Sequence, residues 1–333
     1  MAARAAELWG AKCAALLAPS TFLKFPADDH GRVSALAIFS YAMRGVSATQ
    51  TRIHLTFHAE DANFITRGEL REYLSSMVDA LPALQGMDEA FRETYLDIAM
   101  AHFFFLHDAH NRGRVRIAEL VASPALNEFF ELRSAAQGEA PPQAVLARNW
   151  FSLEATTRLQ RSFMELDRDM NGTLSIRELL QYSGGNLTQM FVKRVFEAHV
   201  AKQKPGRYGP NVSEMEFPAF VDFVLALANK RHARGLAYFF RVFDVGAKGH
   251  LTRADLHSFF REVLVKWTEA GNYEINADDV EDEVVDMINP ADPARITLRD
   301  LQRCGNGEQV VNILSDVAGF WAYDSRESLV QQQ

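Results

Sequence analysis

The sequence predicts a mostly α-helical protein made of repeated helix–loop–helix units. Two observations carry this prediction: apolar residues recur at helical spacing in most segments, and one twelve-residue loop pattern recurs along the chain. Extended alternating runs are short, about three residues each. The clearest helical stripes have residues at i, i+3, i+4 and i+7 or a subset of these; they are Leu159, Phe163 and Leu166, and Leu236, Phe239, Phe240 and Phe243.

Length and composition narrow the class of protein. The chain has 333 residues, which is too long for one minimal core and suits two or three packed units. A hydrophobic fraction of 48% and a charged fraction of 23% are ordinary for globular proteins. The net charge of −8 argues against nucleic-acid binding, which needs a basic face.

Cysteine usage and hydropathy predict an intracellular, cytoplasmic protein. Cys13 and Cys304 lie far apart and match neither a disulfide framework nor a zinc spacing, so a reducing compartment is expected. No run approaches the roughly 18 apolar residues of a membrane span. Lys12 and Glu7 interrupt the small apolar run near the N-terminus, so residues 2–17 are interpreted as an amphipathic helix rather than a secretory signal.

Composition shifts predict the domain organisation. Residues 134–149 begin SAAQGEAPPQ and read as a linker, because Pro141, Pro142 and small residues favour an exposed connection. We therefore expect an N-terminal degenerate helix–loop–helix domain over 1–133 and a second domain over 150–330. A further polar interruption covers 202–213.

The segment 167–178, DRDMNGTLSIRE, matches the EF-hand calcium loop at every informative position. Calcium is a hard cation that takes six to eight oxygen ligands, and this spacing wraps the chain around one point to supply them. Gly172 permits the sharp turn, and Leu174 is expected in a short strand that pairs with a partner loop. The helices 153–166 and 176–182 are expected to flank the loop. The predicted ligands are Asp167, Asp169, Asn171, Thr173 (through its carbonyl), Ser175 (through water) and Glu178.

Two other loops keep the shape of this pattern but lose its ligands. In 244–255, Asp244, Gly249 and Asp255 are retained, whereas Gly246 offers no side-chain oxygen and Lys248 would repel the ion. In 108–119, histidine and arginine replace the oxygen donors. We therefore predict one calcium-binding loop and degenerate relatives.

Weaker echoes extend the series along the whole chain. Aligned by the apolar residue at loop position 8, seven units are found; these residues are Val33, Ile65, Val115, Leu174, Met215, Leu251 and Ile296. The gaps between them are irregular, which favours tandem EF-hand and degenerate EF-hand-like units in an elongated array over a regular solenoid. Core phenylalanines in the helices ahead of such loops, as at Phe104, Phe163 and Phe240, explain part of the unusual total of 24.

Other constellations give weaker signals. A zinc site could be considered at His102, His107 and His110, but their spacing lies partly on a helix and partly in a degenerate loop. Eroded calcium ligands are the favoured interpretation. No nucleophile elbow or phosphate-binding loop is present, so no enzyme is predicted. The C-terminal run 319–323, GFWAY, is interpreted as a core plug, with an aromatic anchor for a partner as the alternative.

The assembled motifs resemble the gamma-type B'' regulatory subunits of protein phosphatase 2A, a group that includes plant FASS (TONNEAU)-type proteins. The resemblance runs from about Gly10 to Val330 and rests on an ordered set of stretches: 10–13 (GAKC), 39–44 (FSYAMR), 50–53 (QTRI), 149–152 (NWFS), the calcium loop, 222–227 (DFVLAL), Asp292-Pro293 with 296–298 (ITL), and 319–327 (GFWAYDSRE). Family members usually carry an additional region ahead of this part.

The resemblance implies a non-catalytic role. Such subunits dock on the helical-repeat scaffold subunit and the catalytic subunit, and direct serine/threonine dephosphorylation to chosen phosphoproteins. In this branch the place is often the microtubule cytoskeleton, including centrosomes, basal bodies and plant cortical arrays. The alternative is a free-standing EF-hand calcium sensor or cytoskeletal adaptor without phosphatase contact.

Overall fold

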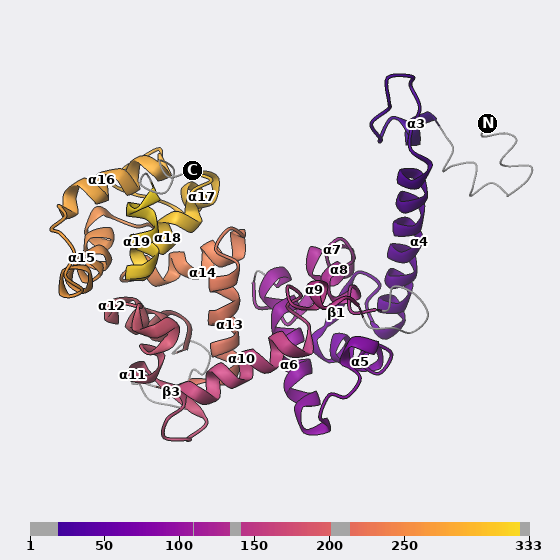
Figure 1. Ribbon diagram of the computed structural model, residues 1–333, viewed down its shortest axis with the longest axis horizontal. Coiled ribbons are helices and arrows are strands. Elements are labelled where there is room, and N and C mark those ends of the chain that lie inside the picture. The colour runs from indigo at the N-terminus through magenta and orange to yellow at the C-terminus, as the bar shows by residue number, and fades with distance from the viewer. Residues whose placement is uncertain (1–18, 109, 134–140, 201–213, 327–333) are drawn as a thin grey trace, which may run out of the picture. The chain divides into compact units, whose positions relative to one another are not determined.

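A computed structural model describes residues 19–108, 110–133, 141–200 and 214–326. The predicted helix over 2–17, Cys13 and the polar interruption at 202–213 lie outside these residues, as does the first half of the predicted linker. The described part is mostly helical and is built of EF-hand-type units, which confirms the predicted fold class (Figure 1). No helix within it is long and apolar enough to cross a membrane.

The chain forms two compact units, and the smaller one comprises residues 1–80 and 111–130. Its helices are α3 (Pro19–Phe22), α4 (Ala35–His58), α5 (Arg67–Val78), α7 (Ile117–Val121) and α8 (Pro124–Phe130). Its strands β1 (Phe64–Thr66) and β2 (Arg114–Arg116) pair antiparallel, with Ile65 opposite Val115. Helix α4 packs on α5 and α7 through Thr51 and Leu55, both buried.

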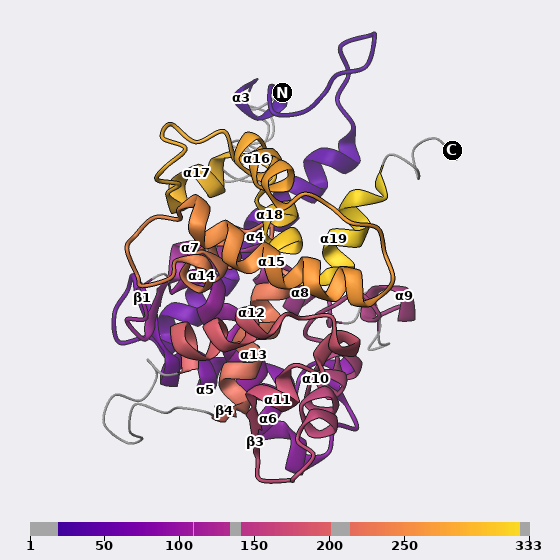
Figure 2. The ribbon, with the colours of Figure 1, turned by 90° about the vertical axis from the view of Figure 1, so that its left-hand side faces the viewer.

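The larger unit comprises residues 81–110 and 131–333. Its first part contains η1 (Pro82–Leu84), α6 (Glu89–His107), α9 (Gln143–Leu146), α10 (Leu153–Leu166), β3 (Thr173–Ser175), α11 (Ile176–Leu179), η2 (Tyr182–Gly185), α12 (Gln189–Val195), the π-helical turn η3 (Phe196–Val200), β4 (Glu214–Glu216) and α13 (Phe217–Ala228). Strands β3 and β4 pair antiparallel, with Leu174 opposite Met215, and lie side by side in Figure 2.

The C-terminal part of this unit is entirely helical in its named elements. They are α14 (Ala233–Phe243), α15 (Arg253–Glu269), α16 (Ala277–Ile288), α17 (Leu298–Arg303), α18 (Gly307–Ser315) and α19 (Val317–Asp324). One β-bridge joins its two loops, since Leu251 and Ile296 exchange backbone hydrogen bonds of 2.8 and 3.0 Å.

Six of the seven position-8 residues therefore form three pairs, each joining two loops. Ile65 meets Val115, Leu174 meets Met215, and Leu251 meets Ile296. All six are at most 1% exposed. The expected partner loop of Leu174 is thus confirmed. Val33 differs, because it bridges to Ala27 within its own segment.

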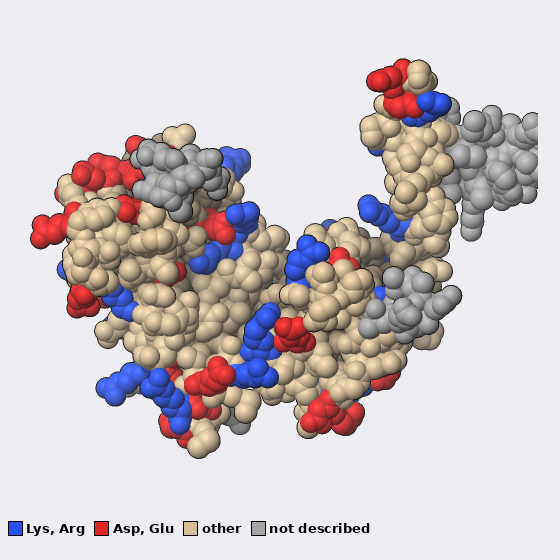
Figure 3. All heavy atoms as spheres, in the orientation of Figure 1, with Lys and Arg blue, Asp and Glu red and all other residues tan. Residues whose placement is uncertain are grey.

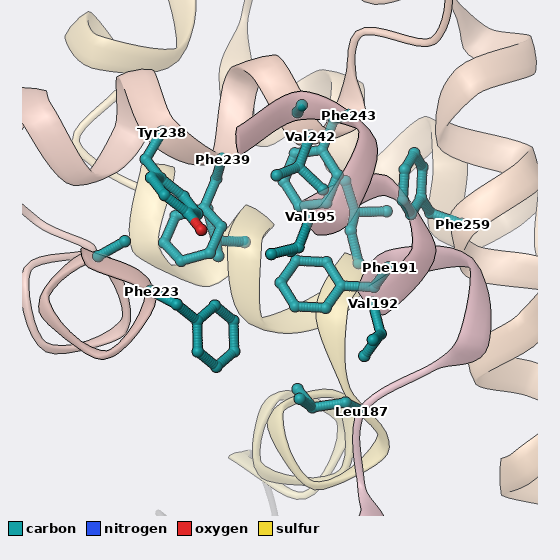
Figure 4. Close-up of a cluster of buried hydrophobic side chains, with 14 of the residues drawn as sticks. Leu187, Phe191, Val192, Val195, Phe223, Tyr238, Phe239, Val242, Phe243 and Phe259 are labelled. Carbon is teal, nitrogen blue, oxygen red and sulfur yellow. The ribbon is translucent and has the colours of Figure 1, made fainter. Parts of the chain in front are cut away.

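The core of the larger unit is rich in phenylalanine. Side chains from α12, α13, α14 and α15 converge in one cluster, drawn in Figure 4. Phe243 contacts both Phe191 and Phe259 edge-on or tilted, at ring-centroid distances of 6.2 and 5.0 Å. The predicted stripe 236, 239, 240 and 243 is buried throughout, at 6% exposure or less. Phe163 of α10 is likewise buried.

The compact units are divided differently from the domains expected at 1–133 and 150–330. Residues 81–110 join the larger unit because α6 packs along α13. The Tyr95 hydroxyl of α6 also donates a 2.8 Å hydrogen bond to the Phe151 carbonyl, just ahead of α10. The linker assignment itself stays a prediction; within it, residues 143–146 form α9.

Candidate calcium site

Helix α10 and strand β3 position the predicted calcium loop, which lies between them in Figure 1. The Ser152 hydroxyl caps the start of α10 by accepting from the Ala155 amide. Leu159 and Phe163 then anchor the helix in the core. The helix ends at Leu166, so Asp167 takes the first loop position, and Leu174 fixes the other end through its pairing with Met215.

Three carboxylates converge in this loop. Each of Asp167, Asp169 and Glu178 offers an oxygen, and these oxygens all lie within 4.8 Å of one another. The Asp167 carboxylate accepts from the Asn171 amide at 3.1 Å and the Gly172 amide at 2.9 Å. These backbone donors hold Asp167 facing inward, so a hard divalent cation would find a preformed set of anionic oxygens.

The middle of the loop is held by side-chain contacts. The Asn171 side-chain oxygen accepts from the Thr173 amide at 2.7 Å and the Thr173 hydroxyl at 2.6 Å. The same hydroxyl lies 2.8 Å from a Glu214 carboxylate oxygen on the paired strand. Asn171 also donates to Asp169 at 3.0 Å. The side chains at positions 3 and 5 are therefore linked to each other, and Thr173 links Asn171 to β4.

Glu178 closes the loop at position 12. Its carboxylate accepts from the Arg168 amide at 2.9 Å and from the amide and hydroxyl of Ser175, both at 2.8 Å. Ser175 in turn caps α11 by accepting from the Glu178 amide, which forms a capping box. Desolvation of this buried carboxyl raises its pKa, but the Ser175 and Arg168 hydrogen bonds outweigh it, so the pKa of Glu178 is lowered overall.

The backbone of the loop takes the left-handed conformations that its turn requires. Met170 at position 4 has φ +55° and Gly172 at position 6 has φ +81°. The degenerate loops repeat this pattern: Asn111 and Gly113 in one, and Ala247 and Gly249 in the other, also have positive φ. The shape expected to survive the loss of ligands is therefore present.

One expected element is shorter than predicted. The helix leaving the calcium loop was expected over 176–182, but α11 ends at Leu179. Ser183 and Gly184 then adopt positive φ within the η2 turn, which a continuous α-helix does not allow. The chain re-enters a helix at Gln189, capped by the Thr188 hydroxyl.

Capping boxes are the functional detail that the sequence interpretation missed. Four loops share a hydroxyl at position 9 that bonds to a carboxylate at position 12; the pairs are Thr66 with Glu69, Ser175 with Glu178, Thr252 with Asp255, and Thr297 with Asp300. The signal was readable as Ser/Thr-x-x-Asp/Glu. It explains how a loop keeps its closing carboxylate without binding a metal.

The described residues contain one further grouping of metal-type side chains, His257, Asp278 and Glu281. There the His257 ring nitrogen lies 2.5 Å from a Glu281 oxygen, so a direct hydrogen bond accounts for the pair. The histidines considered for zinc are not among the groupings in the described residues. His102 is instead buried, stacked on Phe151 with ring centroids 4.8 Å apart.

The residues present at 167–178 fit calcium by their donor chemistry. Three inward carboxylates, an amide oxygen and a glycine-permitted turn match the requirements of a hard cation. Asp167, Asp169, Asn171 and Glu178 would hold the ion with side-chain oxygens. Ser175 and Thr173 lie at the positions that act through water and the backbone carbonyl.

Comparisons with known proteins place the chain. An EF-hand domain profile matches residues 48–134. TON2 of Arabidopsis thaliana, described as a probable B''-type regulatory subunit of serine/threonine-protein phosphatase 2A, is 43% identical over 98% of this chain and 68% of its own length. The B'' gamma subunits of Xenopus tropicalis and Homo sapiens are 34% and 33% identical, over 97% of this chain and about 70% of theirs.

The chain belongs to the B'' family of protein phosphatase 2A regulatory subunits. A solved chain of a protein phosphatase 2A PR70 holoenzyme shares its fold, with a TM-score of 0.64 over 78% of this chain and 92% of that one at 23% identity. The resemblance proposed from the sequence motifs is thereby confirmed.

Within this B'' chain, the C-terminal aromatic run is divided between core and surface. Phe320 is 1% exposed and packs edge-on against Phe260 and Trp267. Tyr323 is also buried, whereas Trp321 is 52% exposed. The run therefore closes the helical core through two residues and leaves one aromatic at the surface.

Proposed function

We propose that this chain is a calcium-binding, non-catalytic regulatory subunit that directs protein phosphatase 2A to phosphoprotein substrates. The observation that carries the proposal is the converging carboxylate set of Asp167, Asp169 and Glu178 within a chain of the B'' family. The role of Ca²⁺ is to fix the angle between α10 and the segment after the loop, and so the surface presented to partners.

The calcium part has a direct test. Asp167→Ala with Glu178→Ala removes the first and last ligands and should abolish calcium binding measured by titration calorimetry. The wild-type chain should bind with a dissociation constant on the order of 10⁻⁷ to 10⁻⁵ M, the range of EF-hand sensors. Unchanged affinity in the double variant would reject the site.

Docking on the phosphatase needs an exposed surface, and α4 offers one. Large apolar residues occupy six of its seven heptad a and d positions, at intervals of three, four, three, seven and four, and Gln50 occupies the remaining one; this is the spacing of a seam that packs against other helices. They are between 49% and 85% exposed; the stripe consists of Leu36, Phe39, Met43, Val46, Ile53 and Phe57. Figure 3 shows this helix as a mostly uncharged surface.

The stripe of α4 is uncharged, so it is suited to a partner that offers an apolar helical surface. Helix α4 contains no acidic residue, and its two arginines, Arg44 and Arg52, lie at heptad positions b and c, on the opposite face of the helix from the seam. We propose that the stripe packs on the helical-repeat scaffold subunit. Such a surface supplies helices for the seam to pack against.

A pull-down with recombinant scaffold and catalytic subunits tests docking. Phe39→Ser with Met43→Ser should weaken capture at least tenfold without lowering the melting temperature, since both side chains are already exposed. Arg44→Ser, on the same helix but outside the stripe, is the matched control. Equal capture by all three chains would remove α4 from the interface, and no capture of the wild type would remove the phosphatase role.

The similarity to TON2 supports a cytoskeletal destination. We propose a cytoplasmic protein acting at the microtubule cytoskeleton, at centrosomes, basal bodies or cortical arrays. Proximity labelling from the tagged chain should recover cytoskeletal or centrosomal proteins together with phosphatase subunits. Recovery of cytoskeletal proteins alone would instead favour the alternative, a free-standing EF-hand sensor or adaptor.

A further inference from the structure

The degenerate loop 244–255 buries two carboxylates that, in a calcium-binding loop, would be ligands. Asp244 at position 1 is 6% exposed and Asp255 at position 12 is 5% exposed. Two buried anions at one point repel each other and are poorly solvated, so the fold needs a compensating cation. The loop cannot recruit calcium well, because position 3 is Gly246 and position 5 carries an ammonium group.

The compensating cation is the side chain of Lys248. Its ammonium nitrogen lies 2.9 and 2.8 Å from the two oxygens of Asp255. It also donates to the Val245 carbonyl at 2.6 Å and lies 4.0 Å from an Asp244 oxygen. The ammonium is therefore surrounded by the position-1 carboxylate, a loop carbonyl and both oxygens of the position-12 carboxylate.

The rest of the loop is arranged as in the calcium loop. The Asp244 oxygens accept from the Lys248 amide at 2.8 Å and the Gly249 amide at 2.7 Å. Asp167 accepts from the equivalent amides of positions 5 and 6. Since the backbone and closing carboxylate match, the two loops differ mainly in what supplies the positive charge.

We propose that Lys248 is a built-in replacement for calcium. The hand formed by α14, loop 244–255 and α15 is then held in one arrangement at all calcium concentrations. Loop 167–178 is left as the calcium-responsive part of the larger unit.

A second contact joins α12 to the hand that Lys248 holds. Arg194 of α12, which follows the calcium loop and α11, donates to the Val242 carbonyl at 3.0 Å and the Asp244 carbonyl at 2.9 Å. These groups form the end of α14 and the start of loop 244–255. Through these hydrogen bonds the hand held by Lys248 fixes the position of α12. A change in the calcium loop would then move that loop relative to α12.

The first test uses a background in which the calcium loop is silent, Asp167→Asn with Glu178→Gln. In this background we expect no effect of about 5 mM calcium on the melting temperature, although that exceeds the 10⁻⁴–10⁻³ M range of weak EF-hand sites. Adding Lys248→Asn, which copies Asn171 of the intact loop, should lower the melting temperature in chelator by roughly 5 °C or more. Calcium should then restore part of the loss.

Lys193→Asn is the matched control, because this lysine is on the surface with 62% of its side chain exposed. It should change neither the melting temperature nor the calcium response. A Lys248→Asn chain as stable as its parent in chelator, or a parent whose stability rises with calcium, would overturn the proposal.

A second test needs no variant and therefore does not depend on folding. In the wild-type chain, an amine-acetylating reagent followed by peptide mass spectrometry should modify Lys248 about tenfold or more slowly than Lys193, because its ammonium is hydrogen-bonded to Asp255 and Val245. Equal rates would contradict the contact on which the proposal rests. Both tests are independent of phosphatase binding.

Discussion

Replacing Glu178 by glutamine separates the two roles of this residue, closing the loop and binding calcium. In the absence of calcium the carboxylate accepts three hydrogen bonds, from the Arg168 amide and from the amide and hydroxyl of Ser175. Glutamine keeps one accepting oxygen and loses the charge. The loss of a capping interaction of this kind costs about 1–2 kcal/mol. Relief of the repulsion from Asp167 and Asp169 offsets part of this cost, so Glu178→Gln should lower stability in chelator by less than that amount.

Calcium adds a second effect. At a free calcium concentration of about 100 times the dissociation constant, binding stabilises the folded chain by about 2.7 kcal/mol. The wild type should gain this amount, which corresponds to roughly 5–11 °C in melting temperature for a unit of this size. Glu178→Gln should gain almost nothing, because position 12 supplies the bidentate ligand.

Asp300→Asn is the matched control within the same unit. Asp300 forms the same capping box, accepting from the Thr297 amide at 2.8 Å and the Thr297 hydroxyl at 2.6 Å, in a loop without a calcium ligand set. It should lose stability in chelator and keep the full gain with calcium. Thermal unfolding of the three chains with and without calcium decides the matter. A Glu178→Gln chain that gains as much as the wild type would refute the assignment.

Three further predictions concern stability. Leu174→Ala removes a fully buried side chain from the paired strands and should cost about 2–5 kcal/mol, measured by thermal unfolding. Burial, and secondarily the charge of His107, lower the pKa of His102 to about 3 from its usual 6.5. As pH falls below 6.5, His102 is therefore protonated in the unfolded chain while it is still neutral in the folded one. This residue alone should lower the free energy of unfolding, measured in urea, by about 2 kcal/mol between pH 7 and pH 5. His102→Phe should remove that loss. Gly235→Ala would place its Cβ 2.0 Å from the Asn229 carbonyl oxygen and should cost about 3 kcal/mol or more. Gly45→Ala, in the middle of α4, meets no atom within 4 Å and should stabilise the chain by about 0.5–1 kcal/mol. Similar melting temperatures for the two glycine variants would contradict this.

The sequence predicted the fold class and the calcium loop because both depend on local patterns. Gly172 and Leu174 have roles set by their positions in the twelve-residue loop, and Phe163 has a role set by its place in the helix four residues ahead of it; the structure gives each of them that role. The position-8 alignment found all six residues that later pair across loops, since an apolar residue at that place is needed on both strands.

The sequence could not predict features that depend on distant residues. Nothing local to α6 shows that it packs on α13, so its place in the larger compact unit could not be predicted. Lys248 was interpreted only as a repulsive charge, because its contact with Asp255 depends on how the loop folds back on itself. The early end of α11 follows from the positive φ of Ser183, which is uncommon for a residue that is not glycine.

The apolar stripe of α4 also bears on how the free chain behaves. Only the last third of this helix is anchored, through buried Thr51 and Leu55, and Gly45 interrupts the part ahead of it. Backbone amides of residues 35–50 should therefore exchange with solvent faster than those of residues 51–58 in the isolated chain. A bound scaffold subunit should slow exchange along the whole helix, which makes amide exchange a direct reporter of assembly.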